Sequence, residues 1–199
     1  MHPQHELDRR APDEIRRQLA AQLRLDHSHL DAIPIEGLYR LREQLTIDEL
    51  TGVLGRRAGI AALLETIVLV RRFRSAELIV AFIDVDGLKR INDTRGHAAG
   101  DLSLMAVTDA VRNVLRRNDI VFRYGGDEFV CALPFVSMEL ACRRMLEAWA
   151  LANRIGLSFS AGFAELRPED DLASLLARAD DCLYAGRRHT GRRSWRIVG

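Results

Sequence analysis

The strongest constraint on the fold is a pair of glycines between two apolar runs. Gly125 and Gly126 separate the apolar residues 120–122 from the apolar residues 129–133. Tight two-residue hairpin turns favour φ > 0, which glycine adopts without steric cost. The pattern therefore predicts a β-hairpin with both glycines in its turn. Two acidic residues follow directly and are expected at its exposed tip: Asp127 and Glu128.

Composition restricts the class of protein. The 199 residues suit one domain plus an appendage, and 48% hydrophobic residues are enough for a proper core. A net charge of +1 gives no global reason to expect a nucleic-acid partner. No apolar run approaches the ~20 residues of a membrane span, and the mixed charges of the first ten residues argue against a signal peptide. Three well-separated cysteines in apolar surroundings fit a reducing compartment, so we expect a cytoplasmic protein without a membrane partner.

The pattern changes near residue 45, which divides the chain into an N-terminal extension, 1–44, and a main domain, 45–199. The extension holds two helical patterns, one over 13–25 and one from residue 36. The second pattern, formed by Leu38, Leu41 and Leu45, is heptad-like but too short to indicate a coiled coil. Packing against the main domain and pairing with a second chain both remain open for this helical stub.

The main domain alternates helical and extended patterns. Helices are predicted over 55–74, 99–116, 138–154 and 172–187, and strands over 78–85, both arms of the hairpin, 157–164 and 194–198. The order β-α-β-β-α-β fits an α+β, ferredoxin-like sandwich. We therefore expect a central antiparallel sheet flanked by helices.

A second chemical motif follows the first predicted strand. Asp84 ends that strand, Gly87 permits a tight turn whose free N–H groups could hold phosphate, and Lys89 adds a positive charge. If this strand pairs with the hairpin, Asp84 and Asp127 converge. Two carboxylates beside phosphate suit Mg²⁺ or Mn²⁺.

These motifs resemble the GGDEF family of diguanylate cyclases. The resemblance is carried by Gly-Gly-Asp-Glu-Phe at 125–129, the segment 48–57, Ser-Ala-Gly at 160–162 and the segment 179–192, and it covers about 46–195. It implies that the sandwich is of the nucleotidyl-cyclase palm type. It also implies condensation of two GTP into cyclic di-GMP and two pyrophosphates. It also implies one GTP per subunit of a homodimer and two Mg²⁺ or Mn²⁺ ions per active site.

The resemblance assigns roles residue by residue. Metal ligands would be Asp84, the carbonyl of Val85, and Asp127. Catalytic residues would be Asp127, Glu128 and Lys89, with either acid as the proton acceptor. Guanine would be read by Asn92 and Asp101, and the remaining substrate-binding positions would be His97, Leu88, Gly125, Gly126, Arg188 and Arg192. The family's phosphate-binding lysine is replaced by arginine, so either Arg187 or Arg188 could take its place.

One further motif points to regulation. Arg116 and Asp119 form an R-x-x-D motif that ends six residues before Gly125, where the family has its inhibitory cyclic di-GMP site. The alternative is a structural role, in which the arginines end a helix and Asp119 opens the next strand.

Two other functions are compatible with the fold. A catalytically weak receptor for GTP or cyclic di-GMP would be expected to lose the signature acids. A cyclase making a cyclic mononucleotide would not need the residues matched to guanine or the R-x-x-D motif.

Overall fold

The computed structural model describes residues 15–17, 20, 28–38, 46–73, 76–190 and 196–197. The chain forms two compact units, Met1–Glu49 and Leu50–Gly199. In the first unit, α2 (Ser28–Asp31) lies between two other helical segments. Its small core consists of Ile15, Ala20, Leu30 and Leu38. The predicted helical patterns are therefore seen in part; two residues of the heptad-like pattern, Leu41 and Leu45, lie outside the described residues.

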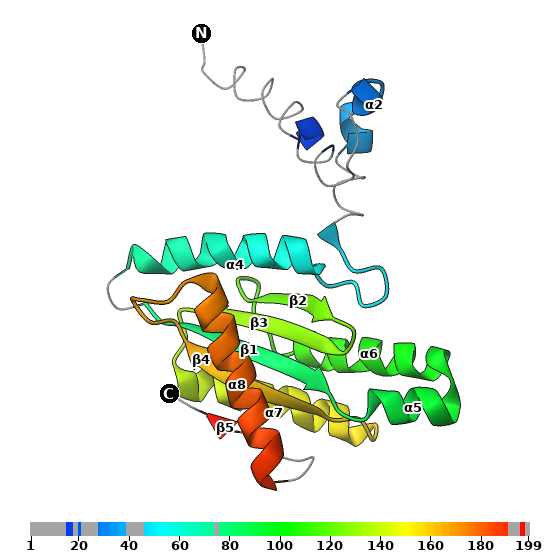
Figure 1. Ribbon diagram of the computed structural model, residues 1–199, viewed down its shortest axis with the longest axis vertical. Coiled ribbons are helices and arrows are strands. Elements are labelled where there is room, and N and C mark those ends of the chain that lie inside the picture. Colours follow the sequence, from blue (N-terminus) through cyan, green and yellow to red (C-terminus); the bar gives the residue numbers. More distant parts are fainter. Residues whose placement is uncertain are drawn as a thin grey trace. The chain divides into compact units, whose positions relative to one another are not determined.

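The second unit is an α+β fold around one sheet (Figure 1). The strands are β1 (Leu78–Val85), β2 (Ile120–Gly125), β3 (Glu128–Pro134), β4 (Phe159–Glu165) and β5 (Arg196–Ile197). They lie in the order β2-β3-β1-β4-β5. Every neighbouring pair is antiparallel except β4 and β5, which are parallel. The expected ferredoxin-like order and central antiparallel sheet are confirmed.

Helices cover both faces of this sheet (Figure 1). One face packs against α6 (His97–Arg112) and α7 (Met138–Arg154), and the other against α4 (Arg56–Arg71) and α8 (Leu172–Thr190). Alternation along β1 explains the two layers, because Ile79, Ala81 and Ile83 face one core while Leu78, Val80 and Phe82 face the other. All six are buried, as a central strand covered on both faces requires.

The remaining helix, α5 (Leu88–Arg95), connects β1 to α6. The apolar pattern does not indicate it, because none of its residues is fully buried. Its start is defined by backbone geometry, since Gly87 has φ 72°, a left-handed conformation that favours glycine.

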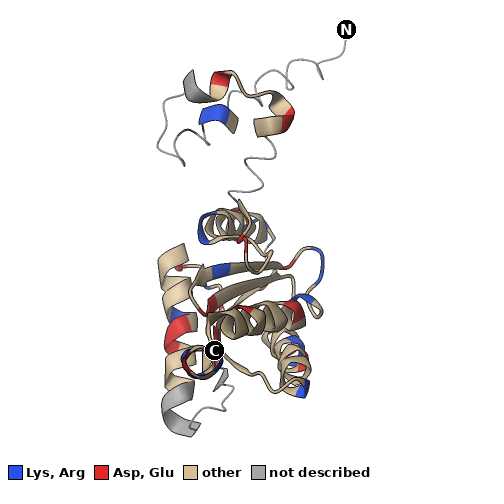
Figure 2. Ribbon diagram, turned by 90° about the vertical axis from the view of Figure 1, so that its right-hand side faces the viewer, with Lys and Arg blue, Asp and Glu red and all other residues tan. Residues whose placement is uncertain are grey.

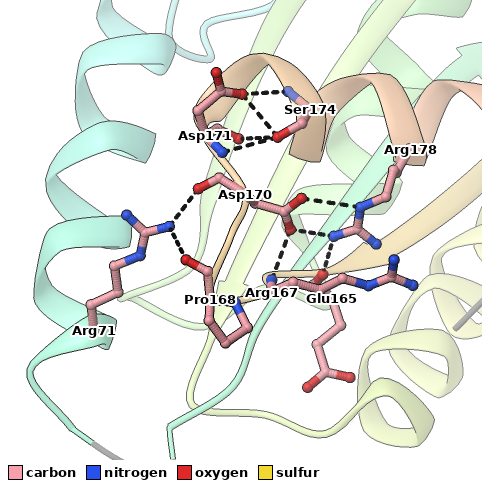
Figure 3. Close-up of polar contacts among 8 residues, drawn as sticks. All are labelled: Arg71, Glu165, Arg167, Pro168, Asp170, Asp171, Ser174 and Arg178. Carbon is pink, nitrogen blue, oxygen red and sulfur yellow. Dashed lines mark hydrogen bonds and ion pairs between the residues drawn. The ribbon is translucent and has the colours of Figure 1, made fainter.

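The sheet end away from β1's C-terminus is braced by polar contacts (Figure 3). Asp170 is buried and accepts hydrogen bonds from Arg178 and from the backbone N–H of Arg167. Arg71, at the end of α4, donates to the backbone carbonyls of Pro168 and Asp170. These contacts join α4, α8 and the loop that precedes α8.

Two global expectations can be compared with the described residues. Basic and acidic residues are interspersed over the second unit, in keeping with the small net charge (Figure 2). Within the described part of the chain, no helix has both the length and the apolarity needed to cross a bilayer.

Candidate active site

The hairpin tip differs in detail from the sequence-based expectation. Strand β2 ends at Gly125 and β3 begins at Glu128, so the turn consists of Gly126 and Asp127. Neither glycine has a positive φ, and the prediction that both are needed for left-handed geometry is wrong. Space explains Gly125 only in part, because a Cβ there would lie 3.0 Å from Glu128 Oε2, the end of a flexible side chain. A Cβ on Gly126 would meet nothing within 4 Å, so neither packing nor a positive φ requires glycine at that position.

An arginine that the sequence argument missed holds this turn. Arg123 donates from Nε and Nη2 to the carbonyl oxygen of Gly126, at 3.0 and 2.7 Å. The two donors fix the backbone at the tip and leave the Asp127 side chain outside this contact. The sequence offers one signal for Arg123, its position just before the signature. The contact from Arg123 to Gly126 spans an irregular turn and therefore leaves no periodic pattern in the sequence.

The two predicted metal-binding acids meet at the end of β1. Asp84 pairs with Glu128 in the β1–β3 register, and the Val85 N–H donates to the Asp127 carbonyl at 3.0 Å. Asp84 and Asp127 line one cavity of 340 Å³. The other lining residues are Val85, Asp86, Gly87, Leu88 and Lys89. The structure thus brings together the strand-end acid, the hairpin acid and the β1–α5 turn.

The pKa of Glu128 reports the negative charge that gathers beside this cavity. Burial raises the pKa of Glu128, and the negative charges of Asp84, Asp127 and Asp180 raise it further. Arg56 opposes them and lowers it. Asp180, on α8, is a neighbour that the sequence argument did not identify. A cation bound among these acids would offset their mutual repulsion.

The donor set fits a hard divalent cation that also binds substrate. In the part of the chain that the structure describes, no group of three or more His, Cys, Asp or Glu side chains could hold a metal by itself. Mg²⁺ commonly uses one or two carboxylates and takes its other ligands from water and substrate phosphates. Asp84, Asp127 and a backbone carbonyl at Val85 match that requirement.

Asp86 has a structural role beside the cavity. Its carboxylate accepts hydrogen bonds from Ser158 Oγ at 2.9 Å and Ser160 Oγ at 2.8 Å, and its N–H donates to the Ser158 carbonyl at 3.0 Å. These contacts tie the β1–α5 turn to β4. They also explain the serine of the Ser-Ala-Gly strand motif.

The predicted guanine-reading residues lie on α5 and α6. Asn92 is on α5, and its Oδ1 is buried without a hydrogen-bond partner among the described residues. A Cβ on Gly100 of α6 would lie 1.8 Å from that oxygen, so the amide occupies space that only glycine leaves. Asp101 follows Gly100 and is exposed, as is His97 at the start of α6.

Other predicted residues are placed less completely. Leu88 is half-buried and Lys89 is exposed, both on the first turn of α5. Arg187 and Arg188 belong to the last turn of α8, but their side chains lie outside the described residues, as does all of Arg192.

The R-x-x-D motif lies between α6 and β2. Asp119 Oδ2 accepts the Arg116 backbone N–H at 2.7 Å and a hydrogen bond from Arg144 Nη1 at 2.9 Å. The Asp119 side chain is only 2% exposed, while Arg116 is exposed. The sequence argument did not identify Arg144, because a basic residue at this point of an amphipathic helix has no distinctive spacing.

A family model described as "Diguanylate cyclase, GGDEF domain" matches residues 45–193. The chain belongs to this family. The match begins close to the predicted domain start at residue 45 and includes the hairpin, the β1–α5 turn and the R-x-x-D motif.

Curated relatives are named as diguanylate cyclases. Diguanylate cyclase DgcP of Pseudomonas aeruginosa is 34% identical over 172 residues, which cover 81% of this chain and 24% of that protein. Diguanylate cyclase DgcZ of Escherichia coli is 32% identical over 171 residues, which cover 78% of this chain and 54% of that protein. The chain therefore spans about a quarter to a half of these two relatives.

Solved GGDEF structures share the fold. The coiled coil and GGDEF domain of DgcB from Caulobacter crescentus, in complex with c-di-GMP, gives a TM-score of 0.77 at 27% identity and covers 82% of this chain and 91% of that one. Diguanylate cyclase SiaD of Pseudomonas aeruginosa, in complex with its activator SiaC, gives 0.69 at 27% identity, covering 98% and 77%.

Proposed function

We propose that this chain is a diguanylate cyclase that condenses two GTP into cyclic di-GMP and releases two pyrophosphates. The observation that carries the proposal is the meeting of Asp84 and Asp127, from different strands, in one cavity with the β1–α5 turn. Intact signature acids argue against the receptor function. The names of the relatives point to the same reaction.

Two Mg²⁺ or Mn²⁺ ions would be held by Asp84, the Val85 carbonyl and Asp127. When bound, such ions lower the pKa of the attacking hydroxyl and neutralise charge on the phosphates. The protein itself would hold the two carboxylates in position. The hydrogen bond from the Val85 N–H to the Asp127 carbonyl joins the hairpin tip to the end of β1, and Arg123 fixes the turn by donating to the Gly126 carbonyl.

The phosphates would lie over the β1–α5 turn. Gly87 starts α5 in a left-handed conformation and no side chain caps the helix, so the first N–H groups of α5, including that of Leu88, are available to phosphate oxygens. Lys89 would add charge, and Arg188 and Arg192 would bind the γ-phosphate. Gly125 and Gly126 would let the substrate approach the backbone at the tip.

The base would be read between α5 and α6. The buried Asn92 Oδ1 has no partner in the described protein, and a guanine N–H donor would satisfy it. Asp101 would accept a second guanine N–H, with His97 at the ribose or base side. Adenine presents an acceptor at N1 where guanine presents a donor, so GTP should be preferred over ATP.

Each subunit would hold one GTP, and two subunits would face each other in an antiparallel homodimer. The 3′-oxygen of one GTP forms a bond to the α-phosphorus of the other, and the bond from that phosphorus to pyrophosphate breaks. Asp127 or Glu128 would take the hydroxyl proton. A second, equivalent step closes the ring.

Product feedback is also proposed, through Arg116 and Asp119. The exposed Arg116 guanidinium suits phosphate or the guanine edge of cyclic di-GMP. A cytoplasmic location and the absence of nucleic-acid and membrane partners remain predictions.

The proposed reaction is tested by incubating the protein with GTP and Mg²⁺ and separating the nucleotides by chromatography. Failure to form cyclic di-GMP would reject it.

A further inference from the structure

The acid of the R-x-x-D motif is withdrawn into the protein. Asp119 has a 2% exposed side chain, and one of its oxygens accepts both the Arg116 N–H and Arg144 Nη1–H. A ligand on the surface cannot reach this carboxylate while the ion pair is closed.

Arg144 closes the pair from α7. The residue is 6% exposed, and its Nη2 is buried without a hydrogen-bond partner among the described residues. A buried donor without an acceptor is costly, and a guanidinium bonded through one nitrogen lacks the geometry of a bidentate pair. The closed pair is therefore held less firmly than a fully satisfied one.

The two residues of the R-x-x-D motif differ in exposure and in pairing. The Arg116 side chain is exposed and has no partner in the described part of the chain. Asp119 is buried and paired. A ligand that uses both residues finds one presented and the other occupied.

We infer that Arg144 is a latch on the product site. Cyclic di-GMP binding through Arg116 and Asp119 requires the Asp119 carboxylate to leave Arg144, so the apparent affinity is reduced by the fraction of molecules that are closed. This inference rests on the proposed product site. Arg144 acts through Asp119 and is a positioning residue that sets the product concentration at which feedback begins.

The test is calorimetric titration of cyclic di-GMP into the wild-type chain and two variants. Arg144→Met removes the guanidinium and keeps an unbranched apolar side chain on the buried face of α7, and the control Arg143→Met removes the exposed neighbouring charge on α7. Arg144→Met should bind product about tenfold more tightly, the equivalent of one charge-assisted hydrogen bond, and Arg143→Met should stay within about twofold of wild type. Equal or weaker binding by Arg144→Met, or no binding by wild type and Arg144→Met alike, would overturn the latch.

If Arg144→Met does not fold, the wild-type chain decides. The Nε–H resonance of Arg144 in ¹⁵N-arginine-labelled protein should shift as cyclic di-GMP saturates the site, because the ion pair opens. An unshifted resonance in saturated protein would overturn the latch. A parallel GTP turnover assay separates the two proposals, since product binding without product synthesis would reject the cyclase function alone.

Discussion

Asp127 is the residue on which the proposed chemistry depends most. Its backbone carbonyl accepts the Val85 N–H at 3.0 Å, so the hairpin is joined to the end of β1 without the Asp127 side chain. The side chain is half-exposed and lines the candidate cavity. Fold and chemistry are therefore separable at this position.

We predict that Asp127→Ala abolishes cyclic di-GMP synthesis and changes the free energy of unfolding by less than about 0.5 kcal/mol. A matched control is Glu169→Ala, which removes an exposed acid from the loop after β4, at the other end of the sheet. Turnover by both variants and urea unfolding of both decide the matter. Turnover by Asp127→Ala within a few-fold of wild type would remove this residue from the mechanism.

Gly100 is expected to act through Asn92. Gly100→Ala would place a methyl group 1.8 Å from the present position of Asn92 Oδ1, so the amide must move. We expect kcat/KM for GTP to fall about tenfold or more, because a buried hydrogen bond to the base is lost. Because alanine favours helix, the fold should not be destabilised.

The check is a double-mutant cycle. In an Asn92→Ala background, Gly100→Ala should have little additional effect on kcat/KM, since its target is already absent. Full additivity of the two effects would show that Gly100 acts by another route.

Among the elements, α8 packs against β4 at unusually short range. A Cβ on Gly162 would lie 2.2 Å from the Ala179 carbonyl oxygen and 2.2 Å from the Leu183 nitrogen, both of them backbone atoms. Backbone cannot rotate away as a side chain can. The glycine of the Ser-Ala-Gly strand motif therefore permits the contact between helix and sheet.

Gly162→Ala should destabilise the domain by roughly 1–3 kcal/mol, the usual cost of overpacking, and lower the midpoint of thermal unfolding. Gly126→Ala is the control, because its methyl group would enter open space at the hairpin tip and φ there is not positive. Equal unfolding midpoints for the two variants would contradict the close packing of α8.

The polar contacts around Asp170 (Figure 3) should make the stability of the domain depend on pH. Burial raises the pKa of Asp170, but hydrogen bonds from Arg178 and the Arg167 N–H outweigh burial, and the pKa is lowered overall. A lowered folded-state pKa stabilises the fold above the unfolded-state value, and this stabilisation is lost as pH falls through the folded-state value.

Asp170→Asn should therefore reduce the free energy of unfolding by roughly 1.5–3 kcal/mol at pH 7. The difference from wild type should shrink as the pH falls below about 4, where Asp170 of the unfolded wild type begins to take up a proton, and it should be lost once the pH falls through the lower folded-state pKa. Urea unfolding of both proteins at several pH values measures it. A difference that does not change with pH would contradict the assignment.

Much of this arrangement can be predicted from the sequence, because apolar runs and signature residues have strong local signals. The strand 78–85 and the helix 138–154 are confirmed with the predicted bounds. The helix α5 could not be predicted, since it has no buried face. Arg123, Arg144 and Asp180 also could not be predicted, because their roles depend on contacts across turns and between elements.

At the scale of the whole molecule, each subunit of the proposed homodimer would provide one half of the reaction. If each subunit holds one GTP, no single chain can complete the ring. Specific activity should therefore rise with protein concentration until the dimer is saturated. Residues 1–44, whether they pack or pair, would influence that concentration.

The most direct test of the central proposal is turnover of GTP with Mg²⁺ over a range of protein concentrations, with nucleotides and pyrophosphate quantified by chromatography. We predict cyclic di-GMP as the product, two pyrophosphates released for each molecule formed, and a specific activity that increases with concentration. Formation of a cyclic mononucleotide, with one pyrophosphate each and no dependence on concentration, would contradict the proposal. So would intact GTP after prolonged incubation of folded protein.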